Sequence, residues 1–176
     1  MVKNLLDELF SSMRGNKTRQ GRHRDLARGD IVCVEDGILK RYGVWVGDKF
    51  IFYGKNRCGA CVVHEVSFDD FIQGADHFAI CEFPKEYGRP TEWERSINVS
   101  GVIMPQHKIW QMLEWAQKMR KYKRYGYEET ARRAESRIGA DGYLTSEHFA
   151  VWCKTGIAES HELESIRDFW DRMVVY

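Results

Sequence analysis

Between Asp30 and Phe83 the chain carries five short runs rich in Val, Ile, Phe, Tyr and Trp, and this pattern constrains the fold most. The runs are DIVCVEDG, RYGVWVGD, KFIFYG, ACVVHEV and DHFAICEF. Short β-prone runs separated by Asp-Gly, Gly-Asp and similar turn residues are typical of strands joined by tight turns. We therefore expect a mostly antiparallel sheet. Before the last run, Ser67 as N-cap, Asp70 and Gly74 predict one short helix.

After Pro84 the hydrophobic period changes from that of strands to that of helices. An irregular segment, PKEYGRPTEWERSINVSG, comes first. Apolar residues then recur at spacings of three and four, which predicts amphipathic helices. The expected helices cover about residues 105–124, YEETARRAESRIG, SEHFAVWCKTG and HELESIRDFWDRM. Strands followed by helices indicate an α+β domain with helices packed on one face of an antiparallel sheet.

The composition limits the class of protein. The chain has 176 residues, which fits one domain, and 27 Lys+Arg face 26 Asp+Glu, so no broad attraction to nucleic acid is expected. No apolar run reaches the roughly eighteen residues of a membrane helix, so we expect no transmembrane segment. Five scattered cysteines fit a reducing compartment, and we expect a cytoplasmic protein.

The N-terminal residues form a separate region. Residues 1–27 read as an amphipathic helix over 2–13 followed by a basic linker, and residues 28–176 as the domain itself, with a helical insertion at about 85–124. The linker belongs to the basic tract from Arg14 to Arg28, which resembles a solvated segment. The amphipathic helix needs an apolar partner surface, so a homo-oligomer or a protein partner is expected.

Four segments carry a family resemblance. DIVCVEDGILKRYGVWVGDKFIFYG, VHEVSFDDFIQG, YEETARRAESRIG and EHFAVWCKTG resemble the lecithin:retinol acyltransferase (LRAT) domain family, a circularly permuted relative of the NlpC-type, papain-like cysteine peptidases. The resemblance covers roughly residues 28–83 and 125–160, and it implies a permuted papain-like fold. In that family a cysteine directly before Glu-His-Phe is the nucleophile, a strand histidine is the base, and a second polar group, often histidine, orients it. A helix N-terminus and an imidazolium both favour the reactive thiolate.

All three catalytic positions implied by the resemblance are substituted in this chain. Ser146 stands in the nucleophile position, Arg41 in the base position and Tyr53 in the orienting position. Serine needs a base within hydrogen-bond reach, which an always-protonated guanidinium does not provide. We therefore expect a pseudoenzyme or a binding module without a cofactor. The alternative is an acyltransferase or thioesterase-like hydrolase that uses Ser146 with a histidine from elsewhere.

Two non-catalytic roles are also open for Ser146. It fits a helix N-cap whose hydroxyl accepts a backbone N–H. Arg41 beside it would, together with the helix N-terminus, form a pocket for an acyl or anionic small molecule. The next residues, Glu147 and His148, are expected to orient the helix, and Cys153 to be buried in the core.

One further motif lies outside the resemblance. Cys58, Cys61 and His64 have a C-x-x-C-x-x-H spacing, with Cys33 or Cys81 as a conceivable fourth zinc ligand. Strand alternation places Cys61 and His64 on opposite faces, so no metal is predicted from this motif. The preferred interpretation is a hairpin turn with two free thiols.

Overall fold

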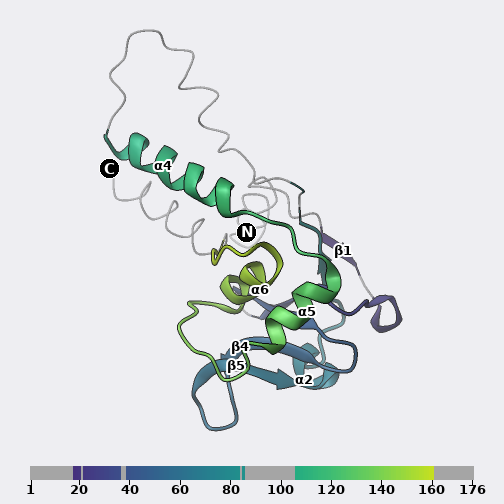
Figure 1. Cartoon of the computed structure of the whole chain (residues 1–176). Coiled ribbons are helices and arrows are strands. Elements are labelled where there is room, and N and C mark those ends of the chain that lie inside the picture. Colours follow the sequence, from purple (N-terminus) through teal and green to yellow (C-terminus); the bar gives the residue numbers. More distant parts are fainter. Residues whose placement is uncertain (1–17, 21, 37–38, 84, 86–105, 161–176) are drawn as a thin grey trace, which may run out of the picture.

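The sheet is antiparallel throughout and has six strands in the order β1-β6-β2-β3-β4-β5 (Figure 1). The structure is a computed structural model that describes residues 18–20, 22–36, 39–83, 85 and 106–160. The strands are β1 (Thr18–Gln20), β2 (Ile31–Asp36), β3 (Leu39–Trp45), β4 (Phe50–Lys55), β5 (Cys61–Val66) and β6 (Ala79–Cys81). The chain runs from β2 to β5 as a meander, and β6 returns to pair with β2. The five predicted strands are all present.

The prediction of a solvated linker before Arg28 is wrong in part. Strand β1 pairs with β6, with Thr18 opposite Cys81 and Gln20 opposite Ala79, and a 3-10 helix, η1 (His23–Asp25), follows it. An edge strand is held by backbone hydrogen bonds to one neighbour, so a polar sequence carries little sign of it.

Four helices are present in the described ranges: α2 (Phe68–Ile72), α4 (Gln106–Lys121), α5 (Tyr127–Glu135) and α6 (Ser146–Thr155). The predicted cap of α2 is confirmed, because the Ser67 hydroxyl accepts the N–H of Asp70 at 3.1 Å. Gly156, with φ of 78°, ends α6 in the left-handed conformation that glycine adopts without strain. The expected helices over 2–13 and 161–173 lie outside the described residues.

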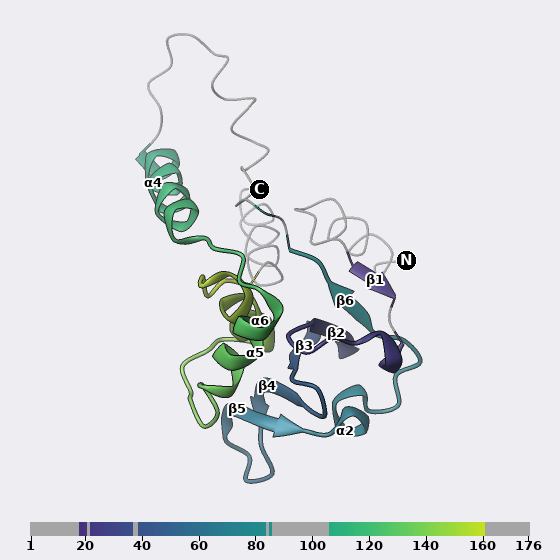
Figure 2. The ribbon, with the colours of Figure 1, turned by 45° about the vertical axis from the view of Figure 1, so that its right-hand side comes forward.

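Helices cover both faces of the sheet. Helices α5 and α6 pack on one face, where Phe149 and Ala134 join Val44 and Val63 in a buried cluster. Helix α2 covers the other face, where Phe71 stacks on Phe50 with ring centroids 4.1 Å apart. Figure 2 shows α5 and α6 on one side of the sheet and α2 on the other. The fold is therefore α+β, with one more covered face than the sequence predicted.

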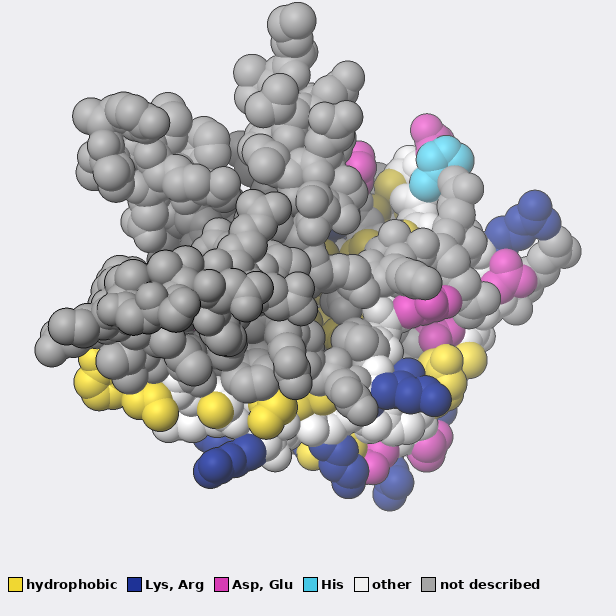
Figure 3. All heavy atoms as spheres, turned by 90° about the horizontal axis from the view of Figure 1, so that it is seen from above, with side chains coloured by type: hydrophobic (Ala, Val, Ile, Leu, Met, Phe, Trp, Pro, Cys, Tyr) yellow, Lys and Arg dark blue, Asp and Glu magenta, His cyan; other side chains and the backbone are white. Residues whose placement is uncertain are grey.

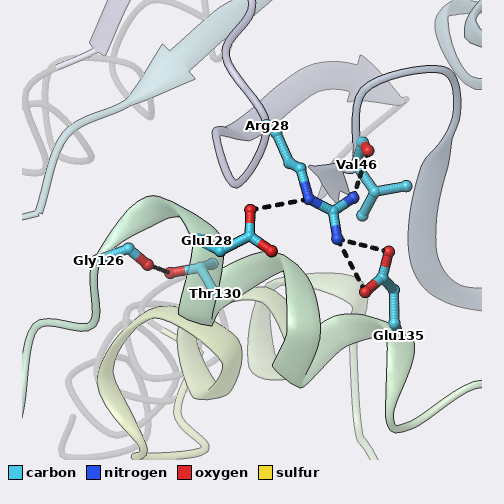
Figure 4. Close-up of polar contacts among 6 residues, drawn as sticks. All are labelled: Arg28, Val46, Gly126, Glu128, Thr130 and Glu135. Atoms are coloured by element: carbon cyan, nitrogen blue, oxygen red, sulfur yellow. Dashed lines mark hydrogen bonds and ion pairs between the residues drawn. The ribbon is translucent and has the colours of Figure 1, made fainter.

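Arg28 joins the start of the domain to α5 (Figure 4). Its guanidinium donates to Glu128 at 3.1 Å, to Glu135 at 2.8 and 2.9 Å, and to the carbonyl of Val46. The next residue, Gly29, lies against the backbone of Tyr127, and an added Cβ would be 1.9 Å from its carbonyl oxygen. Residues 28 and 29 thereby hold α5 on the sheet.

Charges of both signs are interspersed on the face shown in Figure 3. In the view of Figure 3, lysine or arginine side chains alternate with acidic ones along the lower right rim. Of the helices in the described part, none has the length and apolar character needed to cross a membrane.

Candidate functional site

Helix α6 presents its first turn, which begins at Ser146, to strand β3 of the sheet. The cap of the helix is Thr145, whose hydroxyl accepts the N–H of His148 at 3.1 Å. Ser146 is thus the first helical residue, and the expectation that it is the N-cap is wrong by one position. Phe149 and Cys153 are fully buried on the sheet side, as their spacing predicts.

The hydroxyl of Ser146 fills a gap in the sheet. The backbone N–H of Tyr42 donates to its Oγ at 3.0 Å. Strands β3 and β4 pair at Val44 with Ile51 and at Trp45 with Phe50. Extending this register would place Tyr42 opposite Tyr53, and the alternation of hydrogen-bonded pairs would direct the Tyr42 N–H to the Tyr53 carbonyl. The strands separate before that point, and Ser146 supplies the acceptor.

Arg41 lies on the opposite face of the sheet from Ser146. Its guanidinium donates to the carbonyl of Phe71 at 2.8 Å, to Asp36 at 2.6 Å and to Gln73 at 2.9 Å, all on the α2 side. Neighbouring strand residues point in opposite directions, and Tyr42 is the one that packs with the α6 cluster. The expected anion pocket between Arg41 and Ser146 is therefore wrong.

Tyr53 lies on the same face as α6 but within an aromatic group. Its ring meets Tyr143 edge-on at 5.6 Å, and Tyr143 in turn contacts Phe149 at 5.1 Å. Burial raises the pKa of the Tyr53 phenol, and the nearby Cys61 and Asp141 raise it further. The phenol stays protonated at neutral pH, so it is not a base there.

No histidine contact to Ser146 is found among the described residues. Nδ1 of His148 accepts the N–H of Leu144 at 3.3 Å, a bond that directs the ring back along the chain. The ring of His64 packs on Phe52 at 4.6 Å, and its Nδ1 lies 3.0 Å from the carbonyl oxygen of Val62. The described part of the site therefore lacks the base that a serine nucleophile needs.

Glu147 is buried, and it fixes the helix as expected. Its carboxylate accepts the hydroxyl of Ser160 at 2.5 Å, which connects α6 to the segment after it. Its charge also acts on the buried thiol of Cys81. A hydrogen bond to Cys33 raises the pKa of Cys81 well above its usual range. Burial of the thiol and the nearby Glu147 carboxylate raise this pKa further. Burial likewise raises the pKa of Cys153, so these thiols are poor nucleophiles.

The C-terminal end of α6 is stabilised by an arginine that stacks on aromatic rings. The guanidinium of Arg133 lies between Tyr125 and Trp152, 4.2 and 4.0 Å from their ring centroids. It also donates to the carbonyls of Trp152 at 2.9 Å and Cys153 at 3.0 Å. Free carbonyls at a helix C-terminus attract cations, so Arg133 stabilises α6 rather than offering a free charge.

Cys61 and His64 lie on opposite faces of β5, as the alternation predicts. Cys61 lies near Tyr53 on the α6 side, whereas His64 packs on Phe52. Within the described residues no group of three or more His, Cys, Asp and Glu side chains could hold a metal ion.

The sequence did not identify Tyr42 as the residue that faces the helix. The run around it is apolar on both faces, with Val44 and Val46 on one side and Trp45 on the other, so alternation alone did not assign the faces. The structure assigns the faces, because a Cβ on Gly43 would lie 2.6 Å from the ring of Phe71, so residues 41, 43 and 45 lie on the α2 face.

Comparison of the chain with protein-family models gave no match, and comparison with curated proteins gave none either.

Proposed function

We propose that this chain is a catalytically inactive domain of the LRAT-like, permuted papain-like type, and that it works as a cytoplasmic binding or interaction module. The observation that carries the proposal is the bond from the Tyr42 N–H to the Ser146 hydroxyl. The oxygen that would attack a substrate serves as an acceptor that joins α6 to β3.

The residues at the other two positions support the same conclusion. Arg41 is committed to Phe71, Asp36 and Gln73 on the far face, and the pKa of Tyr53 is raised. Loss of one member of a nucleophile and base pair already removes most of the rate. Ser146 lacks the acidity of a thiol, and among the described residues no imidazole is found in contact with it.

The binding partner is more consistent with a protein than with a small anion. Without Arg41, an anion at the start of α6 would depend on backbone N–H groups alone, and the Thr145 hydroxyl already accepts one of them from His148. We therefore infer a protein partner or a second copy of the chain.

The test is covalent labelling followed by intact-mass spectrometry. The folded chain is incubated with a fluorophosphonate and a short-chain thioester, and we expect no adduct that depends on Ser146. Ser146→Ala is the matched control for any adduct that forms. Ser146→Cys, treated with iodoacetamide and mapped by peptide analysis, checks whether the position is accessible, while the buried Cys153 serves as the internal unlabelled thiol.

A one-to-one adduct that is lost in Ser146→Ala would overturn the proposal. It would mean that the chain is a serine acyltransferase or a thioesterase-like hydrolase, with a histidine that approaches Ser146 when substrate binds.

A further inference from the structure

The turn between β4 and β5 holds two exposed thiols in a fixed conformation. Asn56 organises the turn, since its Oδ1 accepts the N–H of Cys58 at 2.9 Å and that of Ala60 at 3.0 Å. The backbone carbonyl of Asn56 accepts the N–H of Gly59 at 2.9 Å. Gly59 has φ of 82°, a conformation that favours glycine. Cys61 follows directly as the first residue of β5.

These two cysteines differ from the other three. Cys58 and Cys61 are exposed, whereas the remaining cysteines are buried in the core. Two thiols separated by two residues form the repeating unit of thiolate metal sites, and zinc is bound most stably by four such ligands. One copy of the chain supplies half of that set.

The described part of a single chain does not complete the set. His64, the nearest candidate by spacing, lies on the opposite face of β5 against Phe52. The described residues contain no group of three metal-binding side chains. All five cysteines of the chain lie in the described part, and the other three are buried in the core, so the two thiolates that complete a four-thiolate site have to come from another molecule.

The position of the turn suits a second copy. Figures 1 and 2 both show the β4–β5 turn at the end of the molecule opposite α4, beyond the rest of the sheet. Two such turns can meet with little contact between the two sheets. An interface of this kind depends on the shared ion, because the turns alone bury little surface.

The charge around the thiols is complementary to a zinc centre. Zn²⁺ with four thiolates carries a net charge of about −2. Lys55, which pairs with Cys61 across the hairpin, and Arg57, which precedes Cys58, are both exposed. Two copies would place four cationic side chains around the anionic centre.

We propose that Cys58 and Cys61 of two copies bind one zinc ion and thereby pair the chains. Four thiols release their protons to solvent, four sulfur–zinc bonds form, and the ion loses its bound waters. The inference concerns the end of the sheet away from α6 and does not depend on whether Ser146 is catalytic.

The test titrates the full-length, reduced chain with Co²⁺ and then Zn²⁺. Intact mass first establishes that no disulfide is present. We expect the intense absorption of tetrahedral cobalt with four thiolates, saturation at about half an ion per chain, and a doubled mass in light scattering on addition of metal. Zinc should displace cobalt and bleach the colour.

Three variants make the test specific. Cys58→Ser and Cys61→Ser should each abolish both the cobalt spectrum and the metal-dependent doubling, whereas His64→Ala should change neither. Saturation at one ion per chain, or metal binding retained by Cys58→Ser, would overturn the proposal. So would a mass that is unaffected by metal in the unmodified protein.

Discussion

Removing the hydroxyl of Ser146 tests the reading of this residue as a structural acceptor. In Ser146→Ala the N–H of Tyr42 loses the Ser146 acceptor, and the pairing of β3 with β4, at Val44 and Trp45, does not extend to Tyr42. The bond is partly buried. An unsatisfied buried N–H costs about 1–3 kcal/mol, and partial access to water favours the lower part of that range. We expect a loss of about 1–2 kcal/mol in the free energy of unfolding.

Denaturant titration measures this loss directly, and thermal unfolding gives a second value. A change of 1 kcal/mol lowers the Tm of a protein of this size by about 2–4 °C. Ser136→Ala is the matched control, since the Ser136 hydroxyl is exposed and donates at 2.8 Å to a carbonyl one turn back on α5. We expect it to change stability by less than about 0.5 kcal/mol. Equal stability of Ser146→Ala and the unmodified chain would refute the structural role.

Two further perturbations test the packing around α5 and α6. In Gly29→Ala the new Cβ would lie 1.9 Å from the Tyr127 carbonyl oxygen at φ of 90°, so we expect a loss of about 2–5 kcal/mol. Gly47→Ala, at φ of 112° with nothing within 4 Å, isolates the backbone strain, and a loss as large as that of Gly29→Ala would contradict the clash. Burial lowers the pKa of Lys154, whose ammonium lies 4.5 Å from the Tyr127 ring centroid. The unfolded chain therefore binds more protons between that lowered pKa and about 10.5, and this residue's contribution to stability rises with pH across that window. Lys154→Met should be as stable as the unmodified chain or more so at neutral pH, with a difference that shrinks as the pH approaches about 10.5 in denaturant titrations. A difference that grows with pH would refute this assignment.

Local signals predicted the elements well. Five strands, the short helix capped by Ser67 and the glycine end of α6 follow from turn residues and caps, which act within a few residues of the chain. The burial of Cys153 follows from the 3.6-residue repeat of a helix. The placement of Cys61 and His64 on opposite faces follows from the two-residue alternation of a strand. Strand β1 did not follow, because its only support is the neighbouring strand β6.

For the three residues that the resemblance implied, the sequence predicted the placement in the fold only in part. The substituted positions Ser146, Arg41 and Tyr53 came from a resemblance, and two of them, Ser146 and Tyr53, lie on the same face of the sheet. The prediction that Arg41 lies beside Ser146 was wrong. Strand β3 is apolar on both faces, so the sequence did not show that Arg41 lies on the face covered by α2. The cap was misplaced by one residue because Thr145 and Ser146 are both good caps, and only the geometry shows which hydroxyl meets the free N–H.

The sequence by itself determined five of the six strands and the four α-helices of the described residues, and it showed that the chain has no histidine at the positions of the resembling family's base. Only the tertiary structure decided that β3 and β4 separate at Tyr42 and that the Ser146 hydroxyl fills the gap. The reason is that a hydrogen bond between residues 104 positions apart depends on how α6 docks on the sheet. Propensity and periodicity act over one or two turns and carry no information about that contact.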